Sequence, residues 1–326
     1  MPLTDRFGRV HDYLRIAVTD RCNLRCVYCM PAQGISWKPR QEILTLEEIV
    51  RIARLLAAHG ISKVRLTGGE PMVRANLHWL IRHLTAIPDV STVAMTTNGV
   101  LLAPQVTELK AAGLQRLNIS LDTLRRDRFH TITLRDELNQ VLAGIEAACA
   151  AGFAQIKLNV VVINSLNDDE CVDFVEFVRE RPLHVRFIEF MPFPGNSWSR
   201  EQYLPWRELR QRLSERYTMI PLAAEQPSVA RGFSIPGYAG TVSFISPLSD
   251  EFCASCNRLR LTADGSLKSC LLYPAEVSLR DALRSGASDA DLLDLVQSAL
   301  TKKHFAHPPE CALPTLDNRC MSQIGG

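Results

Sequence analysis

The sequence lacks several features that would assign it at once to a class of protein. Its 37 Lys and Arg nearly balance its 35 Asp and Glu, so no excess positive charge points to nucleic acid. The long uncharged stretch at residues 232–249 carries three Gly, two Pro and four Ser and cannot form a membrane helix. The N-terminus lacks the apolar core of a signal peptide. We therefore expect a cytoplasmic protein with no membrane partner.

A phosphate-binding P-loop is also missing, because the run Thr67-Gly68-Gly69-Glu70 lacks the Gly-Lys-Ser/Thr ending. What the chain does have is an ordinary globular composition, with 46% hydrophobic and 22% charged residues over 326 positions. It also has ten cysteines, which a reducing compartment makes unlikely to pair as disulfides. Six of them form two trios: Cys22, Cys26 and Cys29, and Cys253, Cys256 and Cys270.

Short β-rich runs alternate with longer helical patterns through the first two thirds of the chain. The runs lie at residues 14–18, 63–67, 92–97, 116–121, 156–163 and 185–190. Thr45 and Glu48 have capping-box spacing before one of the helices, and Asn167 is the expected cap of another. Six βα units predict a parallel sheet with its ligand site at the C-terminal strand ends, two units short of a complete barrel.

Alternate residues of these strands predict a polar face. Lys63 and Arg65 lie on the same side of their strand, because alternate residues of a strand face the same way. The same alternation places other polar residues together on one face of the sheet. These are Arg15, Thr96, Asn98, Asn118, Ser120, Asp122, Lys157, Asn159 and Arg186. Edge strands with a solvated face are the ordinary alternative, but helices usually cover both faces of a parallel sheet. We therefore expect a lumen that holds a large anionic ligand.

The βα rhythm stops near Trp198, and the remainder predicts a smaller second region. A helical segment at 206–217 is followed by Pro- and Gly-rich sequence and then by a β-hairpin at 257–271 that turns at Ala263-Asp264-Gly265. We expect residues 1–197 to form a partial barrel and residues 198–326 a C-terminal region whose hairpin closes the barrel mouth.

The first cysteine trio, Cys-x3-Cys-x2-Cys, directly follows the first strand. Zinc would need a fourth protein ligand, and no histidine lies nearby in the sequence. A four-iron cluster held by three thiolates leaves one iron open to another ligand. The glycines of Thr67-Gly68-Gly69-Glu70-Pro71, at the end of the second strand, allow close approach of the backbone. The combination favours a catalytic iron–sulfur cluster.

With Tyr28 before its last cysteine, this loop resembles the signature of the radical S-adenosylmethionine superfamily. The resemblance implies that the open iron binds the amino and carboxylate groups of S-adenosylmethionine. It also implies that one electron cleaves that cofactor to a 5′-deoxyadenosyl radical, which abstracts hydrogen from the substrate. The protein then orients the reactants and excludes water.

The second trio has its third cysteine on the return strand of the expected hairpin. Pairing about the Asp264-Gly265 turn returns Cys270 to the Cys256 end, so the three sulfurs can converge. A zinc site completed by Cys311, Cys320 or a histidine is the alternative. Arg258 and Arg260 share one face of the outgoing strand and could bind a phosphate or a base.

Both trios, Arg258-x-Arg260 and the terminal Gly325-Gly326 together resemble the GTP 3′,8-cyclase family of molybdenum-cofactor biosynthesis, over essentially the whole chain. The resemblance implies a second four-iron cluster that binds the guanine of GTP. It implies a carbon–carbon lyase that abstracts hydrogen from C3′ of the GTP ribose and joins C3′ to C8, giving 3′,8-cyclo-7,8-dihydro-GTP. A one-electron donor, a downstream cyclic pyranopterin monophosphate synthase and a monomer or homodimer are also implied.

The residues that match the family's motifs fall into four groups. The cluster ligands are Cys22, Cys26, Cys29, Cys253, Cys256 and Cys270. The S-adenosylmethionine contacts are Tyr28, Gly69, Ser120 and Met191. The GTP contacts are Arg15, Lys63, Arg65, Thr96, Lys157, Arg186, Arg258 and Arg260. The residues needed for catalysis are Arg15, Gly325 and Gly326, the last two as a tail that threads into the lumen.

The remaining reactive residues receive structural interpretations. We expect Cys149 and Cys171 to pack in the core, leave Cys311 and Cys320 unassigned, and expect Lys302, Lys303 and His304 to form a solvated face. Two rival functions remain open at this point. One is a radical enzyme that modifies peptides, whose C-terminal cysteines hold auxiliary clusters; the other is a non-enzymatic zinc-binding interaction protein.

Overall fold

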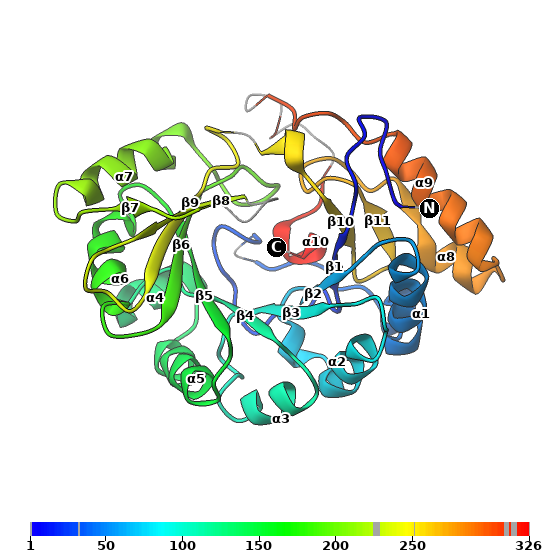
Figure 1. Ribbon diagram of the computed structural model, residues 1–326, viewed down its shortest axis with the longest axis horizontal. Helices are drawn as coiled ribbons and strands as arrows, with labels where there is room; N and C mark the ends of the chain where they lie inside the picture. The colour runs from blue at the N-terminus through cyan, green and yellow to red at the C-terminus, as the bar shows by residue number, and fades with distance from the viewer. Residues whose placement is uncertain are drawn as a thin grey trace.

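The computed structural model describes residues 2–31, 33–223, 229–250, 252–309, 313 and 318–325. Its centre is a twelve-stranded mixed sheet with the order β12-β11-β10-β1-β2-β3-β4-β5-β6-β9-β8-β7. The sheet is open and curves around the C-terminal end of the chain (Figure 1). The strands are β1 (Tyr13–Ala17), β2 (Lys63–Thr67), β3 (Thr92–Thr97), β4 (Arg116–Ser120), β5 (Gln155–Val162), β6 (Leu183–Glu189), β7 (Ile220–Pro221), β8 (Ala230–Ser234), β9 (Thr241–Ile245), β10 (Arg258–Leu261), β11 (Ser266–Lys268) and β12 (Val277–Ser278).

Strands β1 to β6 pair in parallel with their neighbours in chain order, and helices lie between them along the chain. The α-helices are α1 (Leu46–Ala57), α2 (Leu77–Thr85), α3 (Val106–Ala111), α4 (Arg126–Thr133), α5 (Leu138–Ala150), α6 (Cys171–Phe177), α7 (Trp206–Ser214), α8 (Leu279–Arg284), α9 (Asp289–Thr301) and α10 (Met321–Ile324). The α/β alternation predicted from the sequence is confirmed. No helix among the described residues is long and apolar enough to cross a membrane.

Local signals set the helix starts in two different ways. Thr45 and Glu48 form the expected capping box of α1: the Thr45 hydroxyl accepts the Glu48 amide, and the Glu48 carboxylate accepts the Thr45 amide. Asn167 does not cap its helix by its side chain. Its amide oxygen instead accepts the Ile163 N–H at 2.8 Å, and its NH₂ group donates to the carbonyl of Asp122. The side chain therefore joins the ends of β4 and β5.

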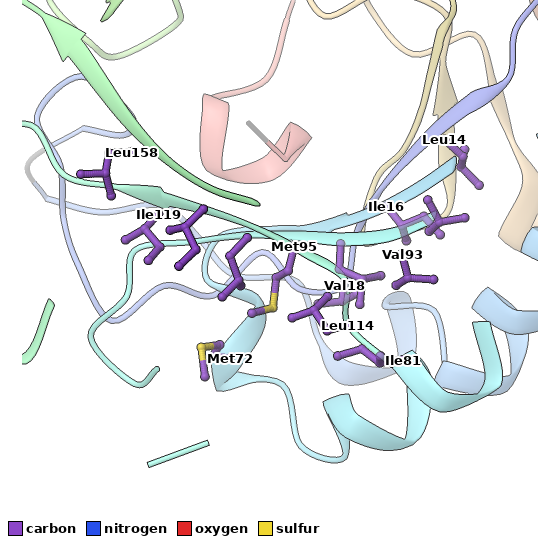
Figure 2. Packing of buried hydrophobic residues seen from close by; sticks show 14 of the residues in the cluster. Leu14, Ile16, Val18, Met72, Ile81, Val93, Met95, Leu114, Ile119 and Leu158 are labelled. Atoms are coloured by element: carbon purple, nitrogen blue, oxygen red, sulfur yellow. The ribbon is translucent and has the colours of Figure 1, made fainter. Parts of the chain in front are cut away.

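One face of the parallel strands carries the apolar core. Buried Leu14, Ile16, Val93, Met95 and Leu158 have the parity opposite to that of the polar face, and they pack toward the helices on the side away from α10 (Figure 2). The opposite face is left to polar side chains and to the C-terminal tail. The outer helices lie around the convex side of the sheet (Figure 1).

The C-terminal region extends both edges of the same sheet. Strand β9 pairs with β6, and β10 pairs with β1, both in parallel. The predicted hairpin is formed by β10 and β11, with Arg260 opposite Lys268. Its turn includes Gly265 at φ 79°, a conformation that glycine adopts at no steric cost. Helix α10 lies on the concave side of the sheet (Figure 1).

Candidate active site

The first cysteine trio lies on the loop that leaves the C-terminal end of β1. Gly68 and Gly69 at the end of β2 pack against the backbone of this loop, and the Gly69 N–H donates to Thr19 O at 2.8 Å. A Cβ on Gly68 would lie 2.6 Å from that same oxygen, and one on Gly69 would overlap Arg21 O. The glycines therefore permit close approach of the cysteine loop itself, which places the three sulfurs beside the strand ends.

The three cysteines of the first trio are half-buried and lie in one another's electrostatic field. Burial raises the pKa of Cys22 to about 11, and burial together with neighbouring cysteines raises the pKa of Cys26 and of Cys29 well above the usual value. The Leu24 N–H donates to the Cys22 sulfur at 3.4 Å. These three soft sulfur donors stay protonated until a cation is present, and such a donor set fits an iron–sulfur cluster.

Polar groups next to the trio join the Tyr28 side of this loop to the sheet. The Tyr28 hydroxyl donates to the Asp122 carboxylate, and burial raises the pKa of Asp122 to about 6. The Asn196 amide donates to the carbonyls of Met191 and Tyr28, at 2.8 and 3.2 Å. Ser120 lies at the end of β4, in register with Asn159. Tyr28, Ser120 and Met191 thus surround the same end of the lumen.

Three arginines lie side by side in the lumen. Arg15 on β1 is in register with Arg65 on β2 and with Arg260 on β10. Burial, and then the charge of Arg260, lower the pKa of Arg15 below its usual value, and burial and Arg258 lower that of Arg260 to about 10. Adjacent buried cations repel one another and are costly without an anion. The row fits a polyanionic ligand.

Tyr13, one pleat before Arg15, lies among the same cations. The Arg65 Nε donates to its hydroxyl at 2.5 Å, and the Lys63 ammonium lies 4.6 Å from its ring centroid. Burial opposes ionisation of the phenol, but the charges of Arg65, Arg15 and Arg258 outweigh it and lower the pKa of Tyr13 to about 6. The Tyr13 hydroxyl is therefore a negatively polarised partner for the neighbouring Arg and Lys side chains.

The opposite wall of the lumen continues the polar lining. Register places Thr96 beside Asn118, Asn118 beside Lys157, and Asn159 beside Arg186. Burial and Arg186 lower the pKa of Lys157 to about 8. The buried Asn118 Oδ1 has no hydrogen-bond partner among the described residues, as expected for a group that awaits a ligand donor. The strand register confirms the shared polar face that strand alternation predicted; that this face holds a large anionic ligand stays a prediction.

The second cysteine trio lies at the other end of the β1–β10 pair. Cys253 and Cys256 precede β10, which begins opposite Tyr13, and Cys270 follows β11. Arg258 and Arg260 face the lumen side, with Leu259 and Leu261 buried behind them. Since β1 rises ~3.3 Å per residue, the two trios flank a stretch of strand about 13 Å long.

The expectation that Lys302, Lys303 and His304 form a solvated face is wrong for Lys303. Lys302 and His304 are exposed, but Lys303 is only 2% exposed. Its Nζ donates to the Cys256 sulfur at 3.5 Å and to the His11 Nε2 at 2.7 Å. Burial opposes ionisation of Cys256, but the Lys303 charge and nearby N–H groups outweigh it and lower the pKa of that thiol. Helical periodicity could not reveal this, because Lys303 follows the end of α9.

Gly325, the last described residue, lies against the polar face of the sheet. Gly325 is buried, and its carbonyl accepts a hydrogen bond from Arg260 Nη1 at 2.8 Å. At φ 85° it lies against Ala17 and Thr67. Gly326, the other predicted tail residue, lies outside the described residues.

Of the cysteines outside the two trios, two lie in or against the core and one lies in the C-terminal tail. Cys171 is buried in α6 and Cys149 packs against the main core, as predicted. Cys320 donates from its sulfur to Pro194 O at 3.2 Å, and Cys311 lies outside the described residues. Over the described part of the chain, no three His, Cys, Asp or Glu side chains are grouped to hold a single metal ion. Cluster thiolates bind separate irons, so the six predicted ligands remain a prediction.

Sequence reasoning missed two lumen residues that alternation could have found. Tyr13 and His184 each lie one residue before the predicted start of their strand, with the parity of Arg15 and Arg186. The His184 ring is hydrogen-bonded to Thr241 and Ser243, at 2.5 and 2.7 Å. Starting each strand earlier would have included both.

Comparisons with known proteins cover nearly the whole chain. The family described as "Radical SAM superfamily" matches residues 16–178, and "Molybdenum Cofactor Synthesis C" matches residues 183–309. The chain is 48% identical to "GTP 3′,8-cyclase" of Moorella thermoacetica, over 99% of this chain and 100% of that one. It is 45% identical to "GTP 3′,8-cyclase, mitochondrial" of Arabidopsis thaliana, over 99% and 83%. The solved structure of Streptococcus suis SuiB shares its fold, with a TM-score of 0.63 and 14% identity over 95% of this chain and 70% of that one.

Proposed function

This chain belongs to the GTP 3′,8-cyclase family of the radical S-adenosylmethionine superfamily, and from that premise we propose which of its residues carry the reaction. The protein is an enzyme that converts GTP to 3′,8-cyclo-7,8-dihydro-GTP, the first step of molybdenum-cofactor biosynthesis. The superfamily uses S-adenosylmethionine and a four-iron cluster.

Cys22, Cys26 and Cys29 would hold the catalytic cluster. When bound there, the cluster and S-adenosylmethionine supply a 5′-deoxyadenosyl radical that removes the hydrogen from C3′ of the GTP ribose. Gly69 fixes the cysteine loop against β2, while Tyr28, Ser120 and Met191 orient S-adenosylmethionine. Tyr28 is itself held by Asp122, so its position is set before the cofactor binds.

The observation that best supports GTP as the substrate is the row of adjacent arginines Arg260, Arg15 and Arg65. The charge of a triphosphate would offset the repulsion among these adjacent guanidiniums, and planar guanidinium groups bind phosphate oxygens in pairs. Lys63, Thr96, Lys157 and Arg186 extend the same lining around the lumen. Arg15, in the middle of the row, contacts the reacting nucleotide and is assigned as catalytic.

Cys253, Cys256 and Cys270 would hold a second four-iron cluster that leaves one iron open to the guanine. Arg258 lies next to this trio and borders the lumen, with its guanidinium carbon 5.7 Å from the Tyr13 ring centroid. The soft sulfur donors, the adjacent cations and the lumen position support this assignment. The two trios then bind the two substrates from opposite ends of one cavity.

The finer architecture follows from this arrangement. We assign residues 1–197 to an incomplete (β/α)6 barrel that binds S-adenosylmethionine, and residues 198–326 to a C-terminal region that binds GTP. The β10–β11 hairpin would close the barrel mouth beside β1, and Gly325 and Gly326 would reach the reacting groups from within. Excluding water from the lumen protects the radical from side reactions.

The reaction needs a one-electron donor and a consumer of its product. We assign the latter to a cyclic pyranopterin monophosphate synthase, and we place the enzyme in the cytoplasm as a monomer or homodimer.

The test is anaerobic turnover with reductant, S-adenosylmethionine and GTP deuterated at C3′. We expect a cyclised nucleotide and 5′-deoxyadenosine that carries the deuterium. Unlabelled 5′-deoxyadenosine, with no cyclised nucleotide, would contradict abstraction from C3′. Omitting GTP controls for uncoupled cleavage of S-adenosylmethionine.

A further inference from the structure

Lys303 combines nearly complete burial with an unusual set of partners. Its ammonium contacts the Cys256 sulfur at 3.5 Å, the His11 Nε2 at 2.7 Å and the Arg258 carbonyl at 3.3 Å. These partners come from two distant parts of the chain: the segment before β1, and the segment that runs from the second cysteine trio into β10. Nothing in the proposed function uses this lysine.

A buried ammonium needs a negative partner. The cost of removing such a charge from water is several kcal/mol unless an opposite charge and full hydrogen bonding compensate it. In the described part of the chain, no carboxylate lies within hydrogen-bond distance of the Lys303 Nζ. Cys256 is the one contact that becomes an anion, since a thiolate is its form as a metal ligand. The charge of Lys303 is therefore directed at a proposed cluster ligand.

His11 fixes where the lysine hydrogens point. It is completely buried, and its Nδ1 lies 3.3 Å from the Leu3 carbonyl. With Nδ1 as the donor to that carbonyl, Nε2 is the acceptor for Lys303. The three N–H bonds of the ammonium then go to His11, to Arg258 O and to the Cys256 sulfur, so none is left unpaired.

We propose that Lys303 is a positioning residue of the second cysteine trio, donating to the Cys256 sulfur while it ties the trio to His11 and to the strand that carries Arg258. This inference rests on the second cluster of the proposed function. A hydrogen bond and a positive charge at a ligand sulfur stabilise the more reduced, more negative form of a cluster. Lys303 therefore raises the reduction potential of the second cluster and slows the loss of its iron.

The experiment compares the holoenzyme with Lys303→Met, Lys303→Gln and Lys303→Arg, with Lys302→Met as the matched control because Lys302 is its exposed neighbour. The readouts are iron content, the rate of iron loss to a chelator, and a potentiometric titration followed by electron paramagnetic resonance. The signal that disappears in Cys256→Ala identifies the second cluster.

We expect Lys303→Met to shift that signal to a lower potential and to lose iron several-fold faster, with the first cluster unchanged. Lys303→Gln, which keeps an N–H donor and is less disruptive to folding, shifts it in the same direction by less. Lys303→Arg restores most of the potential, and Lys302→Met changes nothing. An unshifted potential in both Met and Gln variants overturns the inference while leaving the proposed function intact. A wild-type enzyme with about four irons instead of eight overturns the second cluster, and this inference with it.

Discussion

Arg260 Nη1 donates to the carbonyl of Gly325 at 2.8 Å. The bond joins a guanidinium of the substrate lining to the last described residue of the chain. It places Gly325 beside Ala17 and Thr67, at the ends of β1 and β2 and on the same face of the sheet as the substrate lining. We therefore expect displacement of the tail to weaken substrate binding and turnover more than it lowers the iron content of the cysteine sites.

Gly325→Ala should abolish most cyclisation while leaving both clusters in place. A Cβ there would lie 3.0 Å from the Ala17 Cβ and overlap Thr67 Oγ1, and a positive φ costs an L-residue about 1–2 kcal/mol. Product formation and iron content measure the two effects. Gly286→Ala is the control, since Gly286 has φ 89° but open space around it. Full activity of the Gly325 variant would show that the tail position is not needed.

The tail is held in place by an ion pair with the hairpin turn. Arg319 Nη1 donates to both Asp264 carboxylate oxygens at 2.9 Å, and Lys38 adds a third contact at 3.2 Å. Asp264→Asn should loosen the tail, so that a carboxypeptidase removes it faster and turnover falls. A double-mutant cycle with Arg319→Gln should give a coupling of about 1 kcal/mol. The exposed Arg126–Asp136 pair, far from the tail in the chain, serves as the control, and additive effects at Asp264 and Arg319 would argue against the clamp.

Arg258→Ala should weaken GTP binding and spare S-adenosylmethionine binding. Arg258 lies at the β10 start, beside the second trio and away from the Tyr28 loop. Losing a charged hydrogen bond costs about 1.5–3 kcal/mol, or roughly ten- to a hundredfold in Kd. Anaerobic binding measurements with each ligand test this, with the exposed Arg54→Ala as control. Equal loss of both affinities in a folded variant would contradict the separation of the two sites.

We expect His184 to make the free energy of unfolding decrease as the pH is lowered. Burial, then Lys157 and Arg186, lower its pKa to about 3, whereas an unfolded histidine titrates near 6.5. Between these values the unfolded chain binds one proton more, so the free energy of unfolding decreases as the pH drops below about 6.5, by up to ~1.4 kcal/mol per pH unit.

Anaerobic urea unfolding of wild type and His184→Gln at pH 7.5 and 5.5 measures this contribution. The variant should lose less stability between the two pH values than the wild type. An identical loss in both proteins would show that His184 is not the group responsible.

Much of the fold followed from the sequence because its signals are local. The strands Lys63–Thr67 and Thr92–Thr97 lie where alternation predicted them, and the polar face of the sheet follows from the same parity. The hairpin was marked by its turn residues. The cysteine spacing identified both trios because each is read within one loop or one hairpin.

What the sequence could not supply are the contacts between distant segments. The Lys303 contact with Cys256 spans 47 positions, and that with His11 spans 292. The Asp264–Arg319 pair likewise depends on how the tail returns to the hairpin. The addition of β9 and β10 to opposite edges of one sheet also has no local signal, since pairing partners are chosen by the whole fold.

The proposed radical cyclisation depends most directly on two three-cysteine sites that each hold a four-iron cluster. Iron and acid-labile sulfide analysis of the anaerobically reconstituted protein tests this. We expect a brown protein with about eight iron and eight sulfide per chain, falling to about four of each when Cys253, Cys256 and Cys270 are all replaced by alanine. A colourless protein with stoichiometric zinc, or an iron content that the alanine variant does not change, would contradict it.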